Sequence, residues 1–281
     1  MSIQLSIDST ITLSKSHLEK YHITVLPMHI VFGEESFDDS VNIDAEKLIK
    51  RYQETGEIPS TSACAIGEYQ ELFSRLTADG SEVIHFCMAS EMSSTYQNAC
   101  IAAKDFDSVS VVDTHNITSG TGLMVLKAAE LRDNGYSVKE ILRHVEQMLP
   151  KIRSSFILEN LSFLAKNGRC PSVVAFGANV LGIKPSIVVE NGKMSVGKKF
   201  RGKFDVCVQK YIQSLFENND SVDTSRVSVE YAYGITEAQV DMIKREIRKY
   251  KKFDEVITVY TSSTITAHCG QGVIGVLYLE K

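Results

Sequence analysis

Short apolar runs of strand length alternate with helical segments along the first half of the chain. The strand-like runs cover residues 3–7, 23–32, 83–88 and 108–113. Helical segments lie between them, at residues 15–21, 44–53, 65–76 and from Thr95 onward. This alternation predicts an α/β fold with a mostly parallel sheet and helices on both of its faces. Ligands of such sheets bind at the carboxyl ends of strands, where Asp8, Ser93 and Asp113 are expected.

The second half of the chain has a different pattern. Asn191-Gly192 lies between two strand-like runs and predicts a hairpin. Helices are expected at residues 204–216 and 237–250, and strands at 227–232, 255–261 and 273–279. The segment 150–155 is typical of a crossover between domains. We therefore expect two α/β domains, residues 1–153 and 154–281, the second with a mixed sheet.

Two hydroxyl-rich segments stand just before predicted helices. One contains Ser90, Ser93, Ser94 and Thr95, and the other is 59–62. Free backbone N–H groups and the positive end of the helix dipole at such a place favour a carboxylate or phosphate. The alternative is that these hydroxyls only cap helices. Both segments lie in the first third of the chain, so they are able to converge on one ligand.

Composition excludes several classes of protein. The 281 residues are 43% hydrophobic with a net charge of −5, which argues against nonspecific nucleic-acid binding. The sequence shows neither a signal peptide nor a membrane-spanning run, so a cytoplasmic location is expected. None of the six cysteines forms a C-x-x-C pair, which argues against zinc and thioredoxin-like chemistry, and a cytosolic chain should keep all six thiols reduced. We expect no metal site and no cofactor.

The segment 118–131 predicts a helix that is apolar nearly all round and therefore buried. It is either plain core or one wall of a groove for a long apolar ligand. Its start, Ser119-Gly120-Thr121-Gly122, lacks the Gly-Lys-Ser/Thr of a phosphate-binding loop. Direct nucleotide binding is therefore not indicated.

Two further side chains are candidates for a site. Arg169 follows a helix C-cap at Gly168, where a solvated surface charge is the alternative. His268 stands between a Thr/Ser-rich turn and two glycines, where backbone is able to approach a ligand closely. From the local sequence alone, a structural role for His268 remains equally open.

Taken in order, several short motifs resemble the DegV family of bacterial lipid-binding proteins, which includes the fatty acid-binding subunit of fatty acid kinase. They are residues 8–10, 59–62, 90–97, 113 with 119–120, 167–169, 183–185, 201 and 268–272. The resemblance implies one unit spanning about residues 3–280, with the ligand carboxylate at the junction of two α/β domains. It also implies no catalytic machinery. The bound long-chain fatty acid would be presented to a separate ATP-dependent kinase for acyl-phosphate formation, a step toward phospholipid metabolism.

The same resemblance assigns roles to individual residues. Thr61 and Ser93 would bind the carboxylate, with Arg169, His268, Ser62 and Ser94 as the supporting network. Arg201 would belong to the kinase docking face, against the alternative of a solvated charge beside Lys198 and Lys199. Ala63-Cys64 replaces the usual Gln-Pro, Ser94 replaces Gly and Thr114 replaces Ser. These departures bear on acyl-chain preference more than on the activity.

Two other functions remain open at this point. Ser93, His268 and Asp113 have the residue types of a hydrolase or acyltransferase triad, although Ser93 lacks a Gly-x-Ser-x-Gly elbow. A kinase-type subunit acting on a small polyol is a third reading, which rests on fold analogy with dihydroxyacetone-kinase domains.

Overall fold

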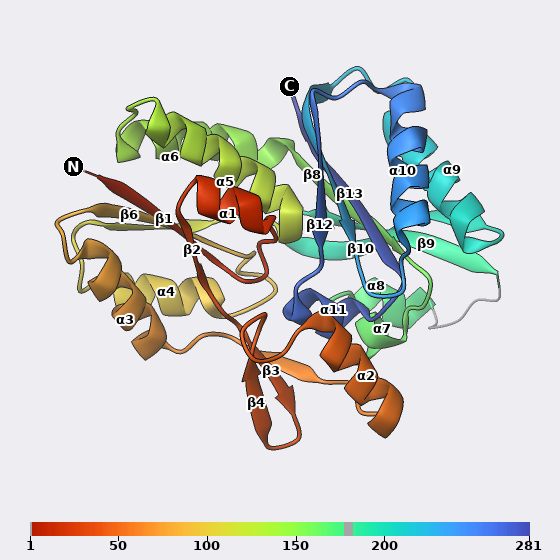
Figure 1. The fold of residues 1–281 in the computed structure, drawn as a ribbon, viewed down its shortest axis with the longest axis horizontal. Helices are drawn as coiled ribbons and strands as arrows, with labels where there is room; N and C mark the ends of the chain where they lie inside the picture. Colours follow the sequence, from red (N-terminus) through yellow and green to blue (C-terminus); the bar gives the residue numbers. More distant parts are fainter. Residues whose placement is uncertain (1, 177–181) are drawn as a thin grey trace.

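The computed structural model describes residues 2–176 and 182–281 (Figure 1). Its first sheet is parallel, with strand order β2-β1-β6-β7. The strands are β1 (Ile3–Asp8), β2 (Ile23–Leu26), β6 (Glu82–Cys87) and β7 (Val109–Asp113). Its helices are α1 (Lys15–Lys20), α3 (Ile66–Thr77), α4 (Thr95–Ala103), α5 (Thr118–Asp133) and α6 (Val138–Met148), followed by the short 3₁₀ turn Leu149–Lys151. Figure 1 shows α3 and α4 on one face of this sheet and α5 and α6 on the other.

A mixed, six-stranded sheet forms the second half, in the order β10-β9-β8-β13-β11-β12. Its strands are β8 (Ile152–Leu158), β9 (Ile183–Glu190), β10 (Lys193–Arg201), β11 (Val222–Tyr231), β12 (Glu255–Tyr260) and β13 (Val273–Glu280). The pair β11 and β12 is parallel and the other neighbours are antiparallel. Helices α9 (Phe204–Phe216) and α10 (Glu237–Tyr250) cover the outer face of this sheet. Three short helices also belong to this half: α7 (Ser162–Asn167), α8 (Pro171–Phe176) and α11 (Ser263–Cys269). The predicted α/β fold with one parallel and one mixed sheet is confirmed.

Helix α5 lies between the two large sheets, where it contacts β8, β11 and β13. Eleven of its sixteen residues are buried, as its all-round apolar sequence predicts. The close approach depends on Gly120, because a Cβ at this position would lie 2.1 Å from the Ser154 Oγ. The helix is thus mostly core, and only its first residue, Thr118, reaches the cavity described below.

The prediction of one strand over residues 23–32 is wrong, because the chain leaves the first sheet at Pro27. Proline has no N–H for the ladder, and the next N–H, that of Met28, donates to the Ser9 Oγ over 3.0 Å. Beyond this break, β3 (His29–Phe32) joins β4 (Glu35–Asp38) and β5 (Ser60–Ser62) in a small antiparallel sheet. This sheet and α2 (Ala45–Thr55) pack against α11, and Ile30, Leu48 and Ala267 lie in their shared core.

The hydroxyl-rich segment also differs from expectation, since residues 60–62 form strand β5 and not the start of a helix. Helix α3 begins only at Ile66, after Ala65. Pairing of Thr61 with Ile30 holds the hydroxyl-rich segment extended. Within the described residues, no helix has both the length and the apolar character needed to cross a bilayer.

Candidate functional site

A cavity of about 250 Å³ lies where the loops after β6 and β7, strand β5, helix α11 and the inner face of the six-stranded sheet meet. Much of its wall is apolar and includes four methionines, Met28, Met88, Met92 and Met194. Methionine side chains are flexible and polarisable, and they adapt to irregular apolar partners. Phe156 and Ile265 add branched and aromatic surface to the same wall. The cavity is therefore suited to an apolar chain.

One side of the cavity holds a contact between Thr61 and His268. Strand β5 supplies Thr61 and helix α11 supplies His268, and the Thr61 Oγ1 lies 2.9 Å from the His268 Nε2. Burial, together with the nearby positive charge of Arg169, lowers the pKa of His268 to about 4. A neutral imidazole therefore positions the Thr61 hydroxyl at neutral pH. The imidazole Nδ1 is buried and has no hydrogen-bond partner among the residues that the structure describes.

His268 lies in a helix, whereas the sequence placed it between a Thr/Ser-rich turn and two glycines. Ser262 caps α11, because its Oγ accepts the Ile265 N–H over 3.4 Å. The helix ends at Gly270, whose φ of +73° suits glycine. The hydroxyl-rich segment and the glycines that flank His268 are therefore the start and end signals of α11.

Ser93 and Ser94 stand at the start of α4 on the cavity wall. The Ser93 Oγ accepts the Thr95 N–H over 3.2 Å and lies 2.7 Å from the Thr95 Oγ1. Ser94 is exposed and its side chain makes no capping hydrogen bond. Ser94 is the N-cap residue, whereas Ser93 precedes it, accepts the N–H of the first helical residue and also lines the cavity.

Arg169 lies at the exposed end of the same wall. Its guanidinium donates to the Met92 carbonyl over 3.4 Å and to the Asn167 carbonyl over 3.0 Å. The exposure of Arg169 and Ser94 identifies this end as the mouth. The structure therefore brings together five of the residues proposed from the sequence: Thr61, Ser93, Ser94, Arg169 and His268.

The other two proposed residues lie outside the cavity wall formed by the described residues. Ser62 is exposed in β5, where its backbone pairs with His29. Arg201 is also exposed, and it is the last residue of β10, paired with Ile183. The strand reaches Arg201 through a register shift between Val196 and Lys199.

The three residues of the alternative triad hydrogen bond to other groups. The Asp113 carboxylate accepts the Ser90 N–H over 3.2 Å and the His115 N–H over 3.0 Å. His268 contacts Thr61, and Ser93 contacts Thr95. This arrangement differs from the nucleophile, base and orienter chain that acyl transfer requires.

Asp8 ends β1 as expected, but it supports loops. It is fully buried, and its carboxylate accepts the Met88 N–H over 2.7 Å and the Thr10 N–H over 2.9 Å. Burial raises the pKa of this carboxyl, and its hydrogen bonds oppose that shift. Because Met88 lines the cavity, Asp8 fixes the wall from behind.

Glu230 is a polar residue of the inner wall that no sequence motif singled out. It is buried, and its carboxylate accepts the Thr12 hydroxyl over 3.1 Å and the Ser119 N–H and hydroxyl over 3.1 and 2.8 Å. Burial raises its pKa against these hydrogen bonds. Ser228 and Glu230 alternate with buried valines in β11, and this alternation was the available signal for a polar inner face.

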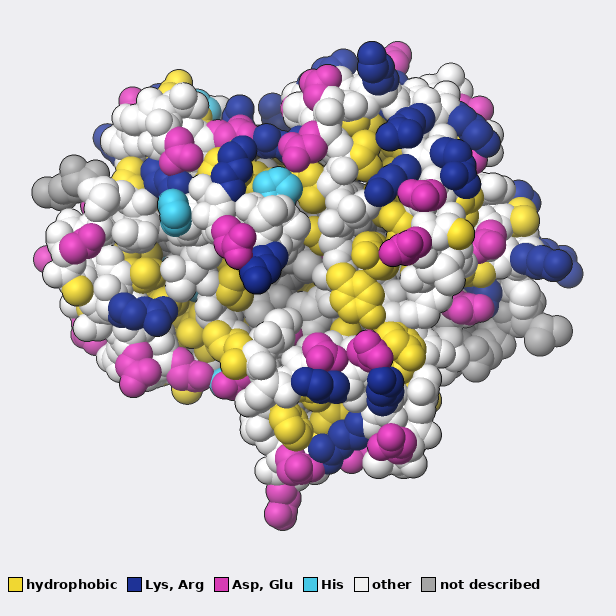
Figure 2. Space-filling view, viewed as in Figure 1, with side chains coloured by type: hydrophobic (Ala, Val, Ile, Leu, Met, Phe, Trp, Pro, Cys, Tyr) yellow, Lys and Arg dark blue, Asp and Glu magenta, His cyan; other side chains and the backbone are white. Residues whose placement is uncertain are grey.

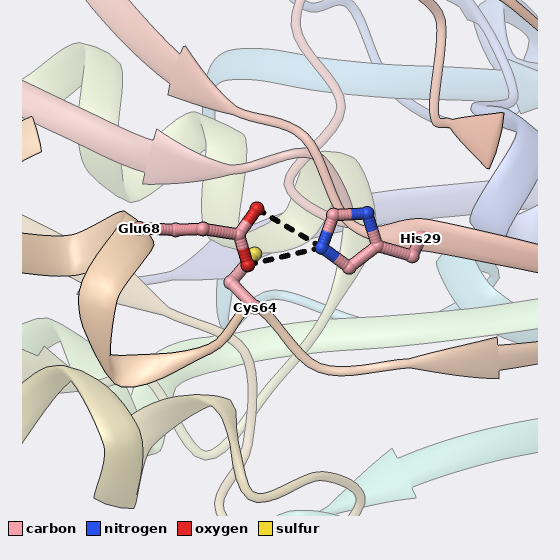
Figure 3. A group of neighbouring side chains, drawn as sticks. All are labelled: His29, Cys64 and Glu68. Atoms are coloured by element: carbon pink, nitrogen blue, oxygen red, sulfur yellow. Dashed lines mark hydrogen bonds and ion pairs between the residues drawn. The ribbon is translucent and has the colours of Figure 1, made fainter. Parts of the chain in front are cut away.

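A compact group formed by His29, Cys64 and Glu68 lies next to β5 (Figure 3). The His29 Nε2 is 3.0 Å from the Glu68 carboxylate, and its Nδ1 is 3.0 Å from that of Asp38. Burial opposes protonation of His29, but the two carboxylates outweigh it and raise its pKa. The buried Cys64 thiol donates to the Pro27 carbonyl over 3.1 Å.

The side chains of His29, Cys64 and Glu68 are of types that ligate metal ions. A second group of such side chains lies close together elsewhere and is formed by Glu91, Asp113 and His115.

The depressed pKa of His268 predicts a pH-dependent loss of stability. Between its ordinary pKa near 6.5 and its folded value of about 4, the unfolded chain binds the proton more readily. The contribution of the His268 pKa shift to the unfolding free energy is fully present above pH 6.5 and is lost as the pH falls. From pH 7 to 4.5, the wild type should therefore lose about 2 kcal/mol more unfolding free energy than His268→Gln. Urea unfolding at both pH values measures this difference, and equal losses in the two proteins would contradict it.

Comparison with known proteins agrees with this architecture. Residues 2–281 match the family model of the DegV proteins, described as uncharacterised. The chain belongs to the DegV family. A DegV domain-containing protein of Clostridium perfringens is 30% identical over 283 residues, covering 99% of each chain. A fatty acid-binding protein of Thermotoga maritima is 28% identical over 284 residues, covering 98% of this chain and 96% of the relative.

A solved DegV structure shows the same fold. The DegV fatty acid binding protein of Bacillus subtilis is 27% identical, and it superposes with a TM-score of 0.87 over 100% of both chains. The resemblance inferred from the short motifs is thereby confirmed over the full chain.

Proposed function

We propose that this DegV protein binds a long-chain fatty acid in the cavity, with the carboxylate at Thr61 and Ser93. The observation that carries the proposal is a largely apolar cavity with hydroxyls and Arg169 at one end. The fatty acid-binding relatives support this ligand class. Arg169 and Ser94 are exposed, so the charged head group lies at the mouth and the tail points inward.

The two ends of the ligand contribute differently to binding. Each buried methylene contributes about 0.8 kcal/mol, so a tail of about 15 carbons contributes on the order of 12 kcal/mol at most. A hydrogen bond to the charged head group contributes about 1.5–3 kcal/mol. The tail therefore sets the affinity, and the head group sets the direction and register of the ligand.

We further propose that the protein acts as a carrier and presents the carboxylate to a separate ATP-dependent kinase, which forms the acyl-phosphate. The hydrogen bonds of Ser93, His268 and Asp113 support a binding role over acyl transfer. A head group at the mouth is also where another protein is able to reach it. Mass spectrometry of the purified protein tests both roles. A co-purifying, unmodified fatty acid supports the carrier, whereas a covalent acyl group on Ser93 would establish the enzyme.

Docking of the kinase gives a prediction for Arg201. Exposed charges mainly affect association rate and partner choice, so Arg201→Ala should slow acyl-phosphate formation severalfold and leave fatty acid affinity unchanged. Raising the salt concentration should reduce the advantage of the wild type.

Helix α10 supplies a matched control for this prediction. Basic side chains gather over α10 on the outer face of the six-stranded sheet (Figure 2). Arg248 is an exposed residue of this helix, and Arg248→Ala should leave the kinase rate near that of the wild type. A larger loss in the Arg248 variant than in the Arg201 variant would move the docking face to α10.

A further inference from the structure

The group formed by His29, Cys64 and Glu68 brings three different donors to one point (Figure 3). The residues come from β3, from the loop after β5 and from the first turn of α3. One nitrogen, one sulfur and one carboxylate oxygen of these side chains lie within 4.8 Å of one another. Bonds of about 2.0–2.3 Å to a tetrahedral zinc ion place ligand atoms about 3–4 Å apart. Small side-chain shifts therefore suffice to close the three donors around one ion.

The nitrogen and oxygen donors are each held in place by a second partner. The His29 Nδ1 lies 3.0 Å from the Asp38 carboxylate, so that the Nε2 faces Glu68. The Glu68 Oε2 accepts the Ala65 N–H over 2.6 Å, and its Oε1 lies 3.0 Å from the same His29 nitrogen. Histidines that bind metals pair their other ring nitrogen with a carboxylate in the same way. The group thus has the outer hydrogen bonds that orient ligands in metal sites.

Cys64 supplies the sulfur donor, and it has a neighbour whose hydroxyl is unpaired. The Tyr69 hydroxyl is buried and finds no hydrogen-bond partner within residues 2–176 and 182–281. Burial raises the pKa of the Cys64 thiol, and the nearby Tyr69 hydroxyl opposes this rise. A thiolate accepts hydrogen bonds more strongly than a thiol. Loss of the Cys64 proton to a metal ion therefore gives the Tyr69 hydroxyl a partner.

The group is open toward solvent and closed toward the interior. The side chains of His29 and Glu68 are 18% and 35% exposed, whereas Cys64 is fully buried behind them. An ion reaches the three donors by separating the His29 and Glu68 side chains. On the interior side, the Cys64 Sγ lies 3.9 Å from the Sδ of Met28, which lines the cavity. The group is therefore next to the cavity but distinct from it.

We propose that His29, Cys64 and Glu68 bind one Zn²⁺ ion, with Asp38 orienting His29 from outside. Zinc accepts this mixture of nitrogen, sulfur and oxygen donors, whereas Mg²⁺ and Ca²⁺ prefer oxygen alone. The ion replaces the proton between the His29 Nε2 and Glu68 and the proton of the Cys64 thiol, and both are released to solvent. Three protein ligands leave the fourth tetrahedral position to water. No C-x-x-C pair marks this site in the sequence, because its donors come from three separate elements.

Zinc titration of the untagged protein tests the site directly. After removal of metals with a chelator, equilibrium dialysis near neutral pH in excess Mg²⁺ should find one zinc ion per chain, with a Kd of about 1 µM or tighter. Zinc at a hundred times this Kd should raise Tm by about 5 °C, because the assembled site exists only in the folded chain. Cobalt(II) in place of zinc should show the near-ultraviolet charge-transfer absorption of a thiolate ligand.

Two variants assign the ion to these donors. Cys64→Ser keeps a hydroxyl that is able to donate to the Pro27 carbonyl. It should weaken zinc binding about a hundredfold or more and abolish the cobalt–thiolate absorption. Glu68→Gln keeps an oxygen for the Ala65 N–H and removes a charged ligand, so it should also weaken binding. The Glu68 variant serves as the test if the Cys64 variant does not fold.

A third variant and a matched control address the surroundings of the ion. Asp38→Ala should retain one zinc ion per chain and weaken its binding about ten- to a hundredfold, because His29 loses its orienting partner. Cys100→Ser is the matched control, since Cys100 is a half-buried free thiol that belongs to neither group of possible metal ligands. This control should bind zinc like the wild type.

The second group of possible ligands, which contains His115, supplies the decisive alternative. If His115→Ala loses the zinc ion and Cys64→Ser retains it, the ion belongs to that group and the proposal is wrong. The proposal is equally wrong if the stripped protein binds zinc only loosely at several places, or not at all. His29 is then an imidazolium paired with Asp38 and Glu68. None of these results bears on fatty acid binding, which titration of the cavity tests separately.

Discussion

Lengthening a saturated fatty acid from octanoate toward stearate should strengthen its binding about fourfold per methylene until the cavity is full. The expectation follows from the apolar wall, where Met28, Met88 and Phe156 surround the path of the tail. Beyond the length that the cavity holds, further methylenes remain in water and the affinity should level off. Isothermal titration below the critical micelle concentration of each acid measures the series.

The chain-length series has an internal control. Ser93→Ala removes a head-group contact and leaves the apolar wall intact, so its affinities should shift together and keep the same slope with chain length. A flat dependence on chain length in the wild type would exclude tail burial as the source of affinity.

Removal of the head-group hydroxyls should produce the second large effect. Thr61→Ala and Ser93→Ala should each weaken binding by about 1.5–3 kcal/mol, roughly ten- to 150-fold, because each loses a hydrogen bond to a charged carboxylate. Ser93→Ala should also cost about 1 kcal/mol of folding stability, since the Ser93 hydroxyl accepts the N–H of Thr95, the first residue of α4. Binding and thermal unfolding measured on the same samples separate the two losses.

A neighbouring serine tests whether the effect is local to the site. Ser60 lies in β5 with Thr61 but is exposed, so Ser60→Ala should bind fatty acid like the wild type. Unchanged affinity in both the Thr61 and Ser93 variants would refute the placement of the carboxylate.

Much of the first sheet could be predicted because its signals are local. The run 83–88 is apolar and of strand length, and it forms β6 with one residue more at its start and one fewer at its end. The all-round apolar sequence of α5 likewise predicted its burial between other elements. The division of residues 23–32 could not be predicted in the same way, because β3 is held by β5 and α11, which lie far away in the sequence. Pro27 interrupts this run, but a proline by itself does not reveal that the chain changes sheets.

The site was predicted where a side chain had a local signal or a family motif. Thr61, Ser93 and His268 were singled out from hydroxyl clusters and motif order, and the structure brings them to one cavity. Glu230 was missed because its place on the cavity wall depends on which face of β11 points inward. That face is set by the register of β8, β13 and β11, and not by the residues next to Glu230 in the sequence.

The last strand of the chain occupies the centre of its sheet, and this position orders the events of synthesis. Strand β13 lies between β8 and β11, and α11 with His268 comes just before it. The six-stranded sheet therefore cannot close during translation until residues 273–280 have left the ribosome. A nascent chain that lacks this strand consequently has no finished cavity, so the proposed lipid binding requires that residues 273–280 have folded into the sheet. Deletion of this strand should abolish fatty acid binding. It should also leave an aggregation-prone chain, because the edges of β8 and β11 that pair with β13 would then be exposed.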